Sequence, residues 1–292
     1  MKKEAFRKLV NQKTVLLDGA TGTNLYAAGM PRGISTERWN LSRPQHITEL
    51  QQAYVRAGSD IVYAPTFSAN ELGLSMFGLE NRLEELNRDL VRLSREAVAG
   101  EALVAGDMSS LGKPLIAAND LSFEKAFDIY RRQAEALCNA GVDLIVAETM
   151  MGIEETVAAL QAIQAVCELP VLCTLSVSAD GEAIFDGNAF DAAETLSELG
   201  ADAVGINCSA GPDQLEAVIA TMRARTDLPL IVKPNAGMPE IDEKGNVHYS
   251  MGPEDFAKHM LHLKDLGADI LGGCCGTTPE HIAALHKALS NP

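Results

Sequence analysis

Three of the six cysteines lie in segments where a thiol could take part in chemistry. Cys208 follows the apolar run AVGIN, and the vicinal pair Cys274 and Cys275 lies in the segment GGCCGTT. Thiolates are preferred ligands of Zn²⁺, and a catalytic zinc keeps one tetrahedral position free for substrate or water. If folding brings them together, the three thiols predict such a metal site. The alternative is a buried or redox-active vicinal pair with an unrelated, packed Cys208.

The glycines around the vicinal pair bear on its geometry. Neighbouring residues of a regular strand point to opposite faces, so both thiols can bind one metal only where the chain leaves strand geometry. Gly272, Gly273 and Gly276 permit such a bend. The segment 278–280 (TPE) then predicts a helix start, whose N-terminus favours the thiolate form. The same glycines and helix start would also suit a phosphate-binding loop.

Carboxylates follow other apolar runs. Glu148 lies at the end of DLIVAETM, and Asp18 with Gly19 ends the run TVLLDGA. A buried carboxylate needs a partner, so Glu148 is a candidate receptor for a substrate ammonium, with an internal ion pair or a cap as the alternative. Asp107, near the end of ALVAGDMS, has the same two interpretations. The glycines after Asp18 allow the backbone to approach a ligand, and a tight turn is their other explanation.

A regular framework must position these residues, and the apolar pattern indicates which one. Eight short apolar runs, near-continuous as in parallel strands, alternate with segments whose apolar residues recur every three or four positions, as in amphipathic helices. Eight such units in 292 residues predict an α/β fold, a single (β/α)8 TIM barrel spanning residues 1–292. The predicted strands are 14–20, 60–67, 102–109, 143–150, 170–177, 202–209, 229–236 and 269–276.

Further features refine this prediction. The first twelve residues, MKKEAFRKLVNQ, predict a short amphipathic helix before the barrel. A Gly-x-Asp repeat precedes every second strand, at 58–60, 141–143, 200–202 and 267–269, and glycine suits the left-handed end of a helix. Because chemistry in such barrels lies at the carboxyl ends of the strands, we expect the cysteines and carboxylates to meet there. The long loop to about residue 43, which holds Trp39, should cover part of that face.

The charge balance excludes several partners. The chain has 24 basic and 40 acidic residues, a net charge of −16, whereas nucleic acids and anionic membranes need concentrated Lys and Arg. No apolar run is long enough for a transmembrane helix or a signal peptide. We therefore expect a cytoplasmic protein without nucleic-acid or membrane partners. Cys138 and Cys167, in predicted helices, and Cys173, in a predicted strand, should pack as small apolar side chains.

Taken together, these motifs resemble those of the homocysteine S-methyltransferase family over nearly the whole chain. Within that family the resemblance is greatest to the homocysteine-binding domain of cobalamin-dependent methionine synthases. It implies an enzyme that transfers a methyl group to the thiol of homocysteine and so produces methionine. The matching segments are DGATGT (18–23), AGSDIVYAPTF (57–67), ET (148–149), GINCS (205–209), PNAG (234–237) and GGCCGT (272–277).

The resemblance also implies a role for each candidate residue. A free thiol is mostly protonated at neutral pH, and binding to zinc converts it to the nucleophilic thiolate. The homocysteine sulfur would occupy the fourth zinc position, which Asn235 would fill or border when substrate is absent. The implied zinc ligands, which activate the substrate thiol, are Cys208, Cys274 and Cys275. The implied contacts to the amino-acid end of homocysteine are Asp18, Gly19 and Glu148.

The methyl donor is the finer question. The chain corresponds to the first module of a cobalamin-dependent methionine synthase without its folate, cobalamin and reactivation modules. The resemblance therefore implies methylcobalamin, or another methyl-corrinoid, carried by a separate protein. A small donor such as S-methylmethionine or betaine is the alternative, and the segment 109–115 (SSLGKPL), shorter than the usual loop of the family, bears on that choice. Two further alternatives are another thiol or selenol acceptor and a non-catalytic subunit that binds homocysteine or zinc.

Overall fold

The computed structural model, which describes residues 1–116, 121–242 and 247–290, is a barrel of eight parallel strands. The hydrogen-bonded order is β1-β10-β7-β6-β5-β4-β3-β2, and a parallel bridge between Leu17 and Ile61 joins the two outer strands. All eight predicted strands are present, so the prediction of a TIM barrel is confirmed. They are β1 (Val15–Leu16), β2 (Ile61–Tyr63), β3 (Leu103–Ser109), β4 (Leu144–Met150), β5 (Val171–Leu175), β6 (Ala203–Asn207), β7 (Leu230–Lys233) and β10 (Ile270–Leu271).

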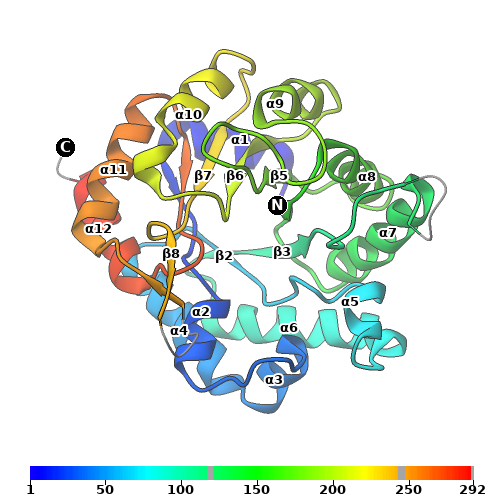
Figure 1. Ribbon diagram of the computed structural model, residues 1–292. Helices are drawn as coiled ribbons and strands as arrows, with labels where there is room; N and C mark the ends of the chain where they lie inside the picture. The colour runs from blue at the N-terminus through cyan, green and yellow to red at the C-terminus, as the bar shows by residue number, and fades with distance from the viewer. Residues whose placement is uncertain (117–120, 243–246, 291–292) are drawn as a thin grey trace.

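One long helix follows each strand and packs outside the barrel (Figure 1). In the helix after β2, Leu83, Leu86 and Leu90 recur at helical spacing, and each is at most 1% exposed. Apolar faces of this kind bury the outer surface of the sheet, as the sequence period predicts. The eight helices are α4 (Pro44–Ala57), α6 (Leu83–Val98), α7 (Phe123–Asn139), α8 (Ile153–Gln164), α9 (Ala189–Glu198), α10 (Glu216–Arg223), α11 (Pro253–Asp265) and α12 (Pro279–Ser290).

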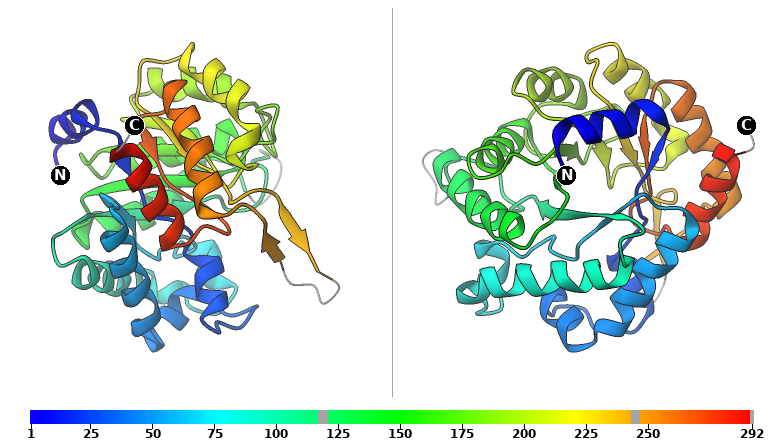
Figure 2. Two further views of the ribbon diagram at one scale, coloured as in Figure 1. Left: turned by 90° about the vertical axis from the view of Figure 1, so that its left-hand side faces the viewer. Right: turned by 180° about the vertical axis from the view of Figure 1, so that it is seen from behind.

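The predicted N-terminal helix, α1 (Lys3–Gln12), lies across the amino end of the barrel (Figure 2, right). Phe6 and Val10 are buried and join the side chains that fill the barrel interior, among them Ile61 and Leu144. The barrel is therefore closed at this end and can open only at the carboxyl ends of its strands.

The four Gly-x-Asp repeats adopt the same local structure, and all lie at the amino end of the barrel. All four glycines have a positive φ, between 81° and 110°, and each lies in the turn after a helix. Each aspartate accepts a backbone N–H from the start of a neighbouring strand at 2.9–3.0 Å and also pairs with a cation. The pairs are Lys13–Asp60, Arg95–Asp143, Lys3–Asp202 and Arg223–Asp269.

The connections at the opposite end are longer. They contain α2 (Gly22–Ala27), α3 (Thr36–Ser42), α5 (Glu71–Ser75), η1 (Glu80–Arg82) and η2 (Pro212–Gln214), and a hairpin of β8 (Pro239–Ile241) and β9 (Val247–Tyr249). The hairpin, which the apolar pattern does not predict, projects away from the barrel (Figure 2, left). Trp39 is buried with Leu25 and Met30. Thr36 and Glu37 of the same connection line the cavity at the carboxyl ends of the strands, so the first connection covers part of the mouth as expected.

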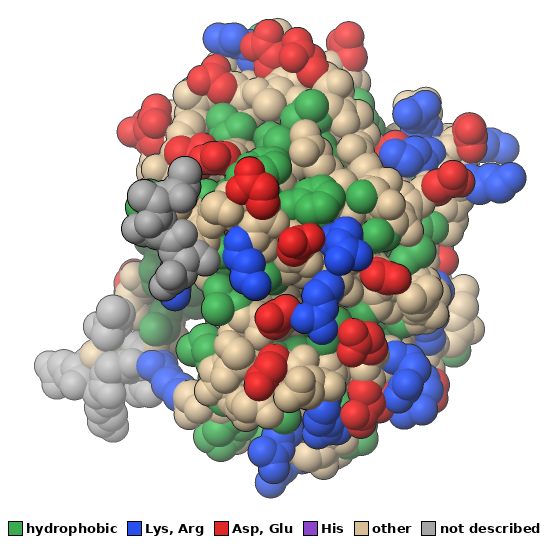
Figure 3. Space-filling view, turned by 90° about the vertical axis from the view of Figure 1, so that its right-hand side faces the viewer, with side chains coloured by type: hydrophobic (Ala, Val, Ile, Leu, Met, Phe, Trp, Pro, Cys, Tyr) green, Lys and Arg blue, Asp and Glu red, His purple; other side chains and the backbone are tan. Residues whose placement is uncertain are grey.

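The outer surface beside α5, α6 and α7 interleaves acidic and basic side chains (Figure 3). Pairs such as Arg82–Glu85 and Arg132–Glu71 account for part of this pattern. Within the described ranges, no helix is long and apolar enough to cross a membrane. Cys138 lies in α7 and Cys173 in β5, as predicted, but Cys167 lies beyond the end of α8 rather than in a helix, because α8 ends at Gln164.

Candidate active site

The three predicted cysteines meet at the carboxyl end of the barrel. Their Sγ atoms all lie within 4.8 Å of one another, and Cys208 Sγ is 3.6 Å from Cys275 Sγ. Tetrahedral ligands at the Zn–S distance of about 2.3 Å stand about 3.8 Å apart. Hydrogen bonds from the other two thiols lower the pKa of Cys275, while the same contacts raise the pKa values of Cys208 and Cys274, so one of the three sulfurs ionises most readily. Donor type and spacing therefore fit a zinc ion.

Strand order and local backbone geometry produce this convergence. Strands β6 and β10 both pair with β7, so the residues that follow them come together. Strand β10 ends at Leu271, and the vicinal pair follows in a loop, where Cys274 N–H donates to Pro234 O at 2.7 Å. Gly276 has a φ of +82°, which confirms the expected departure from strand geometry. Cys208 itself has a φ of +50°, unusual for a residue with a side chain.

A group of carboxylates surrounds one buried lysine beside the thiols. Lys233, the last residue of β7, is 3% exposed. Its Nζ is 3.6 Å from Asp18 Oδ1 and 4.0 Å from Glu148 Oε2, and it lies over the Tyr63 ring at 4.9 Å. Asp107, 5% exposed, lines the same cavity. Three carboxyl groups thus share one cation.

Burial perturbs the titration of these groups. Loss of water raises the pKa of Asp18 to about 6, although Lys233 opposes the shift. The same cause raises the pKa of Glu148 to about 8 and that of Asp107 well above its usual value. Burial disfavours the charge of Lys233, but Glu148 and Asp18 outweigh it, so the pKa of Lys233 is raised. The lysine is therefore charged, and the carboxyl groups lack sufficient countercharge.

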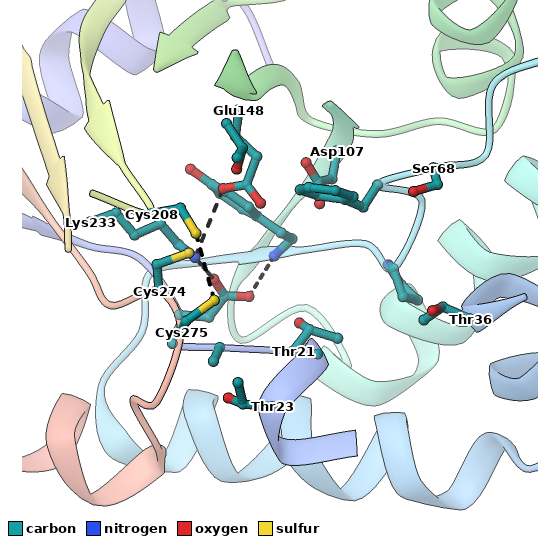
Figure 4. Close-up of a pocket in the computed structure, with 18 of the residues that line it drawn as sticks. Thr21, Thr23, Thr36, Ser68, Asp107, Glu148, Cys208, Lys233, Cys274 and Cys275 are labelled. Atoms are coloured by element: carbon teal, nitrogen blue, oxygen red, sulfur yellow. Dashed lines mark hydrogen bonds and ion pairs between the residues drawn. The ribbon is translucent and has the colours of Figure 1, made fainter. Parts of the chain in front are cut away.

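These groups line one cavity of about 220 Å³ (Figure 4). Sites for drug-sized ligands usually measure about 300–1,000 Å³, so this cavity suits a smaller molecule. The sulfur atoms and Lys233 lie on one side of it, with Glu148 and Asp107 on another. Two of its buried polar atoms, Tyr63 OH and Asp107 Oδ1, have neither a hydrogen-bond partner nor an ion-pair partner among the described residues, and a third, Asp18 Oδ1, has only the ion pair with Lys233. The cavity therefore offers unpaired polar atoms to a ligand.

Two other predicted residues have structural constraints of their own. A side chain at Gly19 would clash with the Tyr54 hydroxyl and with Thr277, so only glycine fits where the first connection enters the cavity. Asn235 is 7% exposed and lies outside the cavity lining. Its amide donates to Ser209 O at 2.5 Å, and its Oδ1 is a further buried atom without a partner.

Two central residues received no predicted role from the sequence, although Asn207 was placed at the carboxyl end of its strand. Lys233 ends the apolar run LIVK, and Asn207, fully buried, ends β6. Asn207 binds Thr149 and Glu148 at the end of β4. The available signal was a polar residue at the end of a buried strand, directly before the candidate ligand Cys208 in the segment GINC and two residues before Asn235 in the segment KPN.

The fold and the cavity define a TIM-barrel protein with a site at the carboxyl ends of its strands. Within this class the chain belongs to the homocysteine S-methyltransferase family, whose family model matches residues 15–289. This confirms the resemblance on which the enzyme class was predicted.

Two individual relatives are similar to nearly the whole chain. The chain is 28% identical over 302 residues to methionine synthase of Mycobacterium tuberculosis and 27% identical over 298 residues to that of Mycobacterium leprae. These matches cover 97% and 96% of this chain but 25% and 24% of the relatives, so the chain spans about a quarter of their length.

Solved structures of the homocysteine methyltransferase MmuM from Escherichia coli superpose over 96% of this chain and 98% of theirs. The oxidised form gives a TM-score of 0.79 at 26% identity, and the metallated form gives 0.78 at 27% identity.

Proposed function

We propose that this protein transfers a methyl group to the thiol of homocysteine, giving methionine, in a reaction that depends on zinc. The observation that carries the proposal is one small cavity with three clustered thiols on one side and carboxyl groups in excess of cations beside them. Homocysteine has a thiol at one end and an ammonium at the other, so both ends match the groups available. Family membership supports the same acceptor.

The carboxyl groups supply the amino-acid end of the site. Asp18 and Glu148 would accept the substrate ammonium, and Asp107 adds a third carboxyl to the same cavity. The ligand would then provide the countercharge that Lys233 alone does not. The first turn of α2, at Gly22 and Thr23, also lines the cavity.

The thiols supply the other end. Cys208, Cys274 and Cys275 would hold zinc, which as a Lewis acid lowers the pKa of the substrate thiol so that the thiolate is present at neutral pH. Binding of the amino-acid end holds the sulfur of this short substrate beside the cluster. Such positioning is a large part of the catalysis of a displacement. Asn235, with its free Oδ1 next to the cluster-bearing loop, would border the open position.

For the donor we propose a methyl-corrinoid such as methylcobalamin on a separate protein. All large hydrophobic side chains that are exposed in the described ranges lie in strand-to-helix connections, on the mouth side of such a barrel. Exposed apolar side chains concentrated around a site are typical of a docking surface. This mouth rim comprises Tyr26, Ile34, Phe67, Met76, Phe77, Ile116, Ile184, Met238 and Val247.

The donor proposal can be tested with two rim variants. Ile184→Glu and Met238→Glu, 60% and 52% exposed, should slow turnover with a methylated corrinoid protein about tenfold or more, since apolar anchors dominate protein interfaces. Turnover with protein-free methylcobalamin should not change. Efficient turnover with S-methylmethionine or betaine, without any corrinoid, would instead establish the small-donor alternative.

Zinc content tests the core of the proposal. Protein purified under reductant should hold about one zinc per chain, and Cys208→Ser should lose most of it. Cys173→Ser is the matched control, because Cys173 is buried in β5 and outside the cluster. A wild-type protein without zinc after reduction and reloading would refute the mechanism. Zinc and homocysteine binding without turnover under any donor would favour the non-catalytic subunit.

A further inference from the structure

Asn207 lies between the thiol cluster and the carboxyl group of Glu148. Its Oδ1 accepts two hydrogen bonds, from Thr149 N at 2.7 Å and from Thr174 Oγ1 at 2.8 Å. Its Nδ2 has three acceptors around it: Thr149 Oγ1 at 2.7 Å, Glu148 Oε2 at 3.2 Å and Cys274 Sγ at 4.0 Å. The side chain is fully buried, so no water competes for these positions.

The same amide binds one unusual backbone position and is adjacent in the chain to another. Among the described residues, Thr149 and Cys208 are the non-glycine residues with positive φ at the mouth of the barrel, at 55° and 50°. The register between β4 and β5 shifts between Ala147 and Met150, so Thr149 lies in a bulge that sets the direction of Glu148. Asn207 Oδ1 accepts the N–H of that bulge, and Cys208 is its chain neighbour. Strained positions of this kind persist where the surroundings fix them.

The Asn207 amide has fewer N–H donors than there are acceptors around it. An amide nitrogen has two N–H groups, but three acceptors surround this one. In the structure the two shorter contacts go to Thr149 and Glu148, which leaves Cys274 at the longest distance. When Glu148 turns to a substrate ammonium, one N–H becomes free for the sulfur. A hydrogen bond to a thiolate is charge-assisted and stabilises the ionised form.

We propose that Asn207 is a positioning residue that couples occupation of the amino-acid end of the cavity to metal binding by the thiols. Each ligand then strengthens binding of the other, by one shared factor. The inference rests on the proposed function, because it takes the Glu148 side of the cavity as the ammonium subsite and the cysteines as zinc ligands.

The test measures zinc affinity by competition with a chromophoric chelator, with and without saturating L-norvaline. This amino acid carries a methyl group where homocysteine carries its thiol, so it can fill the amino-acid end but cannot bind the metal. In wild-type protein norvaline should tighten zinc binding at least about fivefold, the lower end of typical coupling. In Asn207→Ala norvaline should no longer change zinc affinity, so with norvaline present this variant should bind zinc at least about fivefold more weakly than the wild type.

Thr174→Val is the matched control, because it removes a buried hydrogen bond to the same amide without contact to Glu148 or the thiols. It should lose stability and keep the coupling. If Asn207→Ala does not fold, Asn207→Asp keeps the acceptor for the bulge N–H and replaces only the donor, and it too should show no coupling.

Three results would overturn the inference. Norvaline that binds the wild type without changing its zinc affinity refutes the coupling and leaves the proposed function intact. Coupling that persists in the folded Asn207 variants refutes the role of this residue. Norvaline that does not bind at all refutes both the coupling and the proposed amino-acid subsite.

Discussion

Replacing Glu148 with glutamine should weaken homocysteine binding in a manner that depends on pH. The side chain is 6% exposed, and burial raises its pKa to about 8. In the empty site at pH 6 it is therefore protonated, and glutamine closely imitates a protonated glutamate. Binding a substrate ammonium requires the carboxylate. The difference between the two proteins should thus emerge only as the pH rises.

The magnitude follows from two contributions. A hydrogen bond to a charged group contributes about 1.5–3 kcal/mol. At pH 6 the wild type must first release a proton from a group with a pKa of about 8, two units away, which costs about 2.7 kcal/mol. At pH 6 the free energy gained from the hydrogen bond and the cost of deprotonation nearly cancel. Above pH 8 that cost disappears, so the KM of Glu148→Gln should exceed the wild-type KM by about 10- to 100-fold, at about 1.4 kcal/mol per factor of ten.

The assay is the KM for homocysteine of both proteins at pH values from 6 to 9, taken as a ratio so that titration of the substrate thiol cancels. Glu155→Gln is the control, because Glu155 is also buried but binds Tyr130 and Leu111 outside the cavity. It should leave KM unchanged at every pH. A ratio near one above pH 8, or a large ratio that does not vary with pH, would refute the reasoning.

Further predictions concern the stability of the fold and the retention of zinc. Asp202→Ala should lower the free energy of unfolding by about 3 kcal/mol and Asp269→Ala by about 1 kcal/mol in urea titrations, because their carboxylates are 1% and 39% exposed. Gly276→Ala should release most of the zinc, measured by metal analysis, because its φ of +82° and the Tyr249 ring exclude a side chain. In metal-free protein, Asp18 and Glu148 have raised pKa values, so their protonated forms stabilise the fold below pH 4. This stabilisation should decline as the pH rises toward 8, and the melting temperature measured across this range should fall accordingly.

The sequence predicts the framework well because its signals are local. Near-continuous apolar strands, helical spacing and the glycine before each even strand all concern neighbours in the chain, and the eight strands and α1 are where these patterns place them. The thiols were predictable for a related reason. In a barrel with consecutive units, strands six and eight both flank strand seven, so residues that follow them must approach one another.

The rest of the site depends on contacts between distant segments. Lys233 ends an apolar run, and its importance comes from Asp18 and Glu148, which belong to other strands. Asn207 acts through a bulge in β4 that no apolar pattern reveals. The hairpin was missed because β8 and β9 are three residues each, too short for a periodic signal, and Val247 and His248 in β9 are exposed.

The two ends of the barrel use carboxylates in opposite ways, and the difference separates stability from function. At the closed end each of the four aspartates has at least one cationic partner and one backbone N–H donor, and Asp202 pairs with both Lys3 and Arg7. At the mouth three carboxyl groups share Lys233, and Asp107 Oδ1 has neither a hydrogen-bond partner nor an ion-pair partner among the described residues. Buried polar groups left in this state destabilise a fold. Such a deficit is expected where a ligand completes the site, and a ligand that carries one ammonium group offsets it.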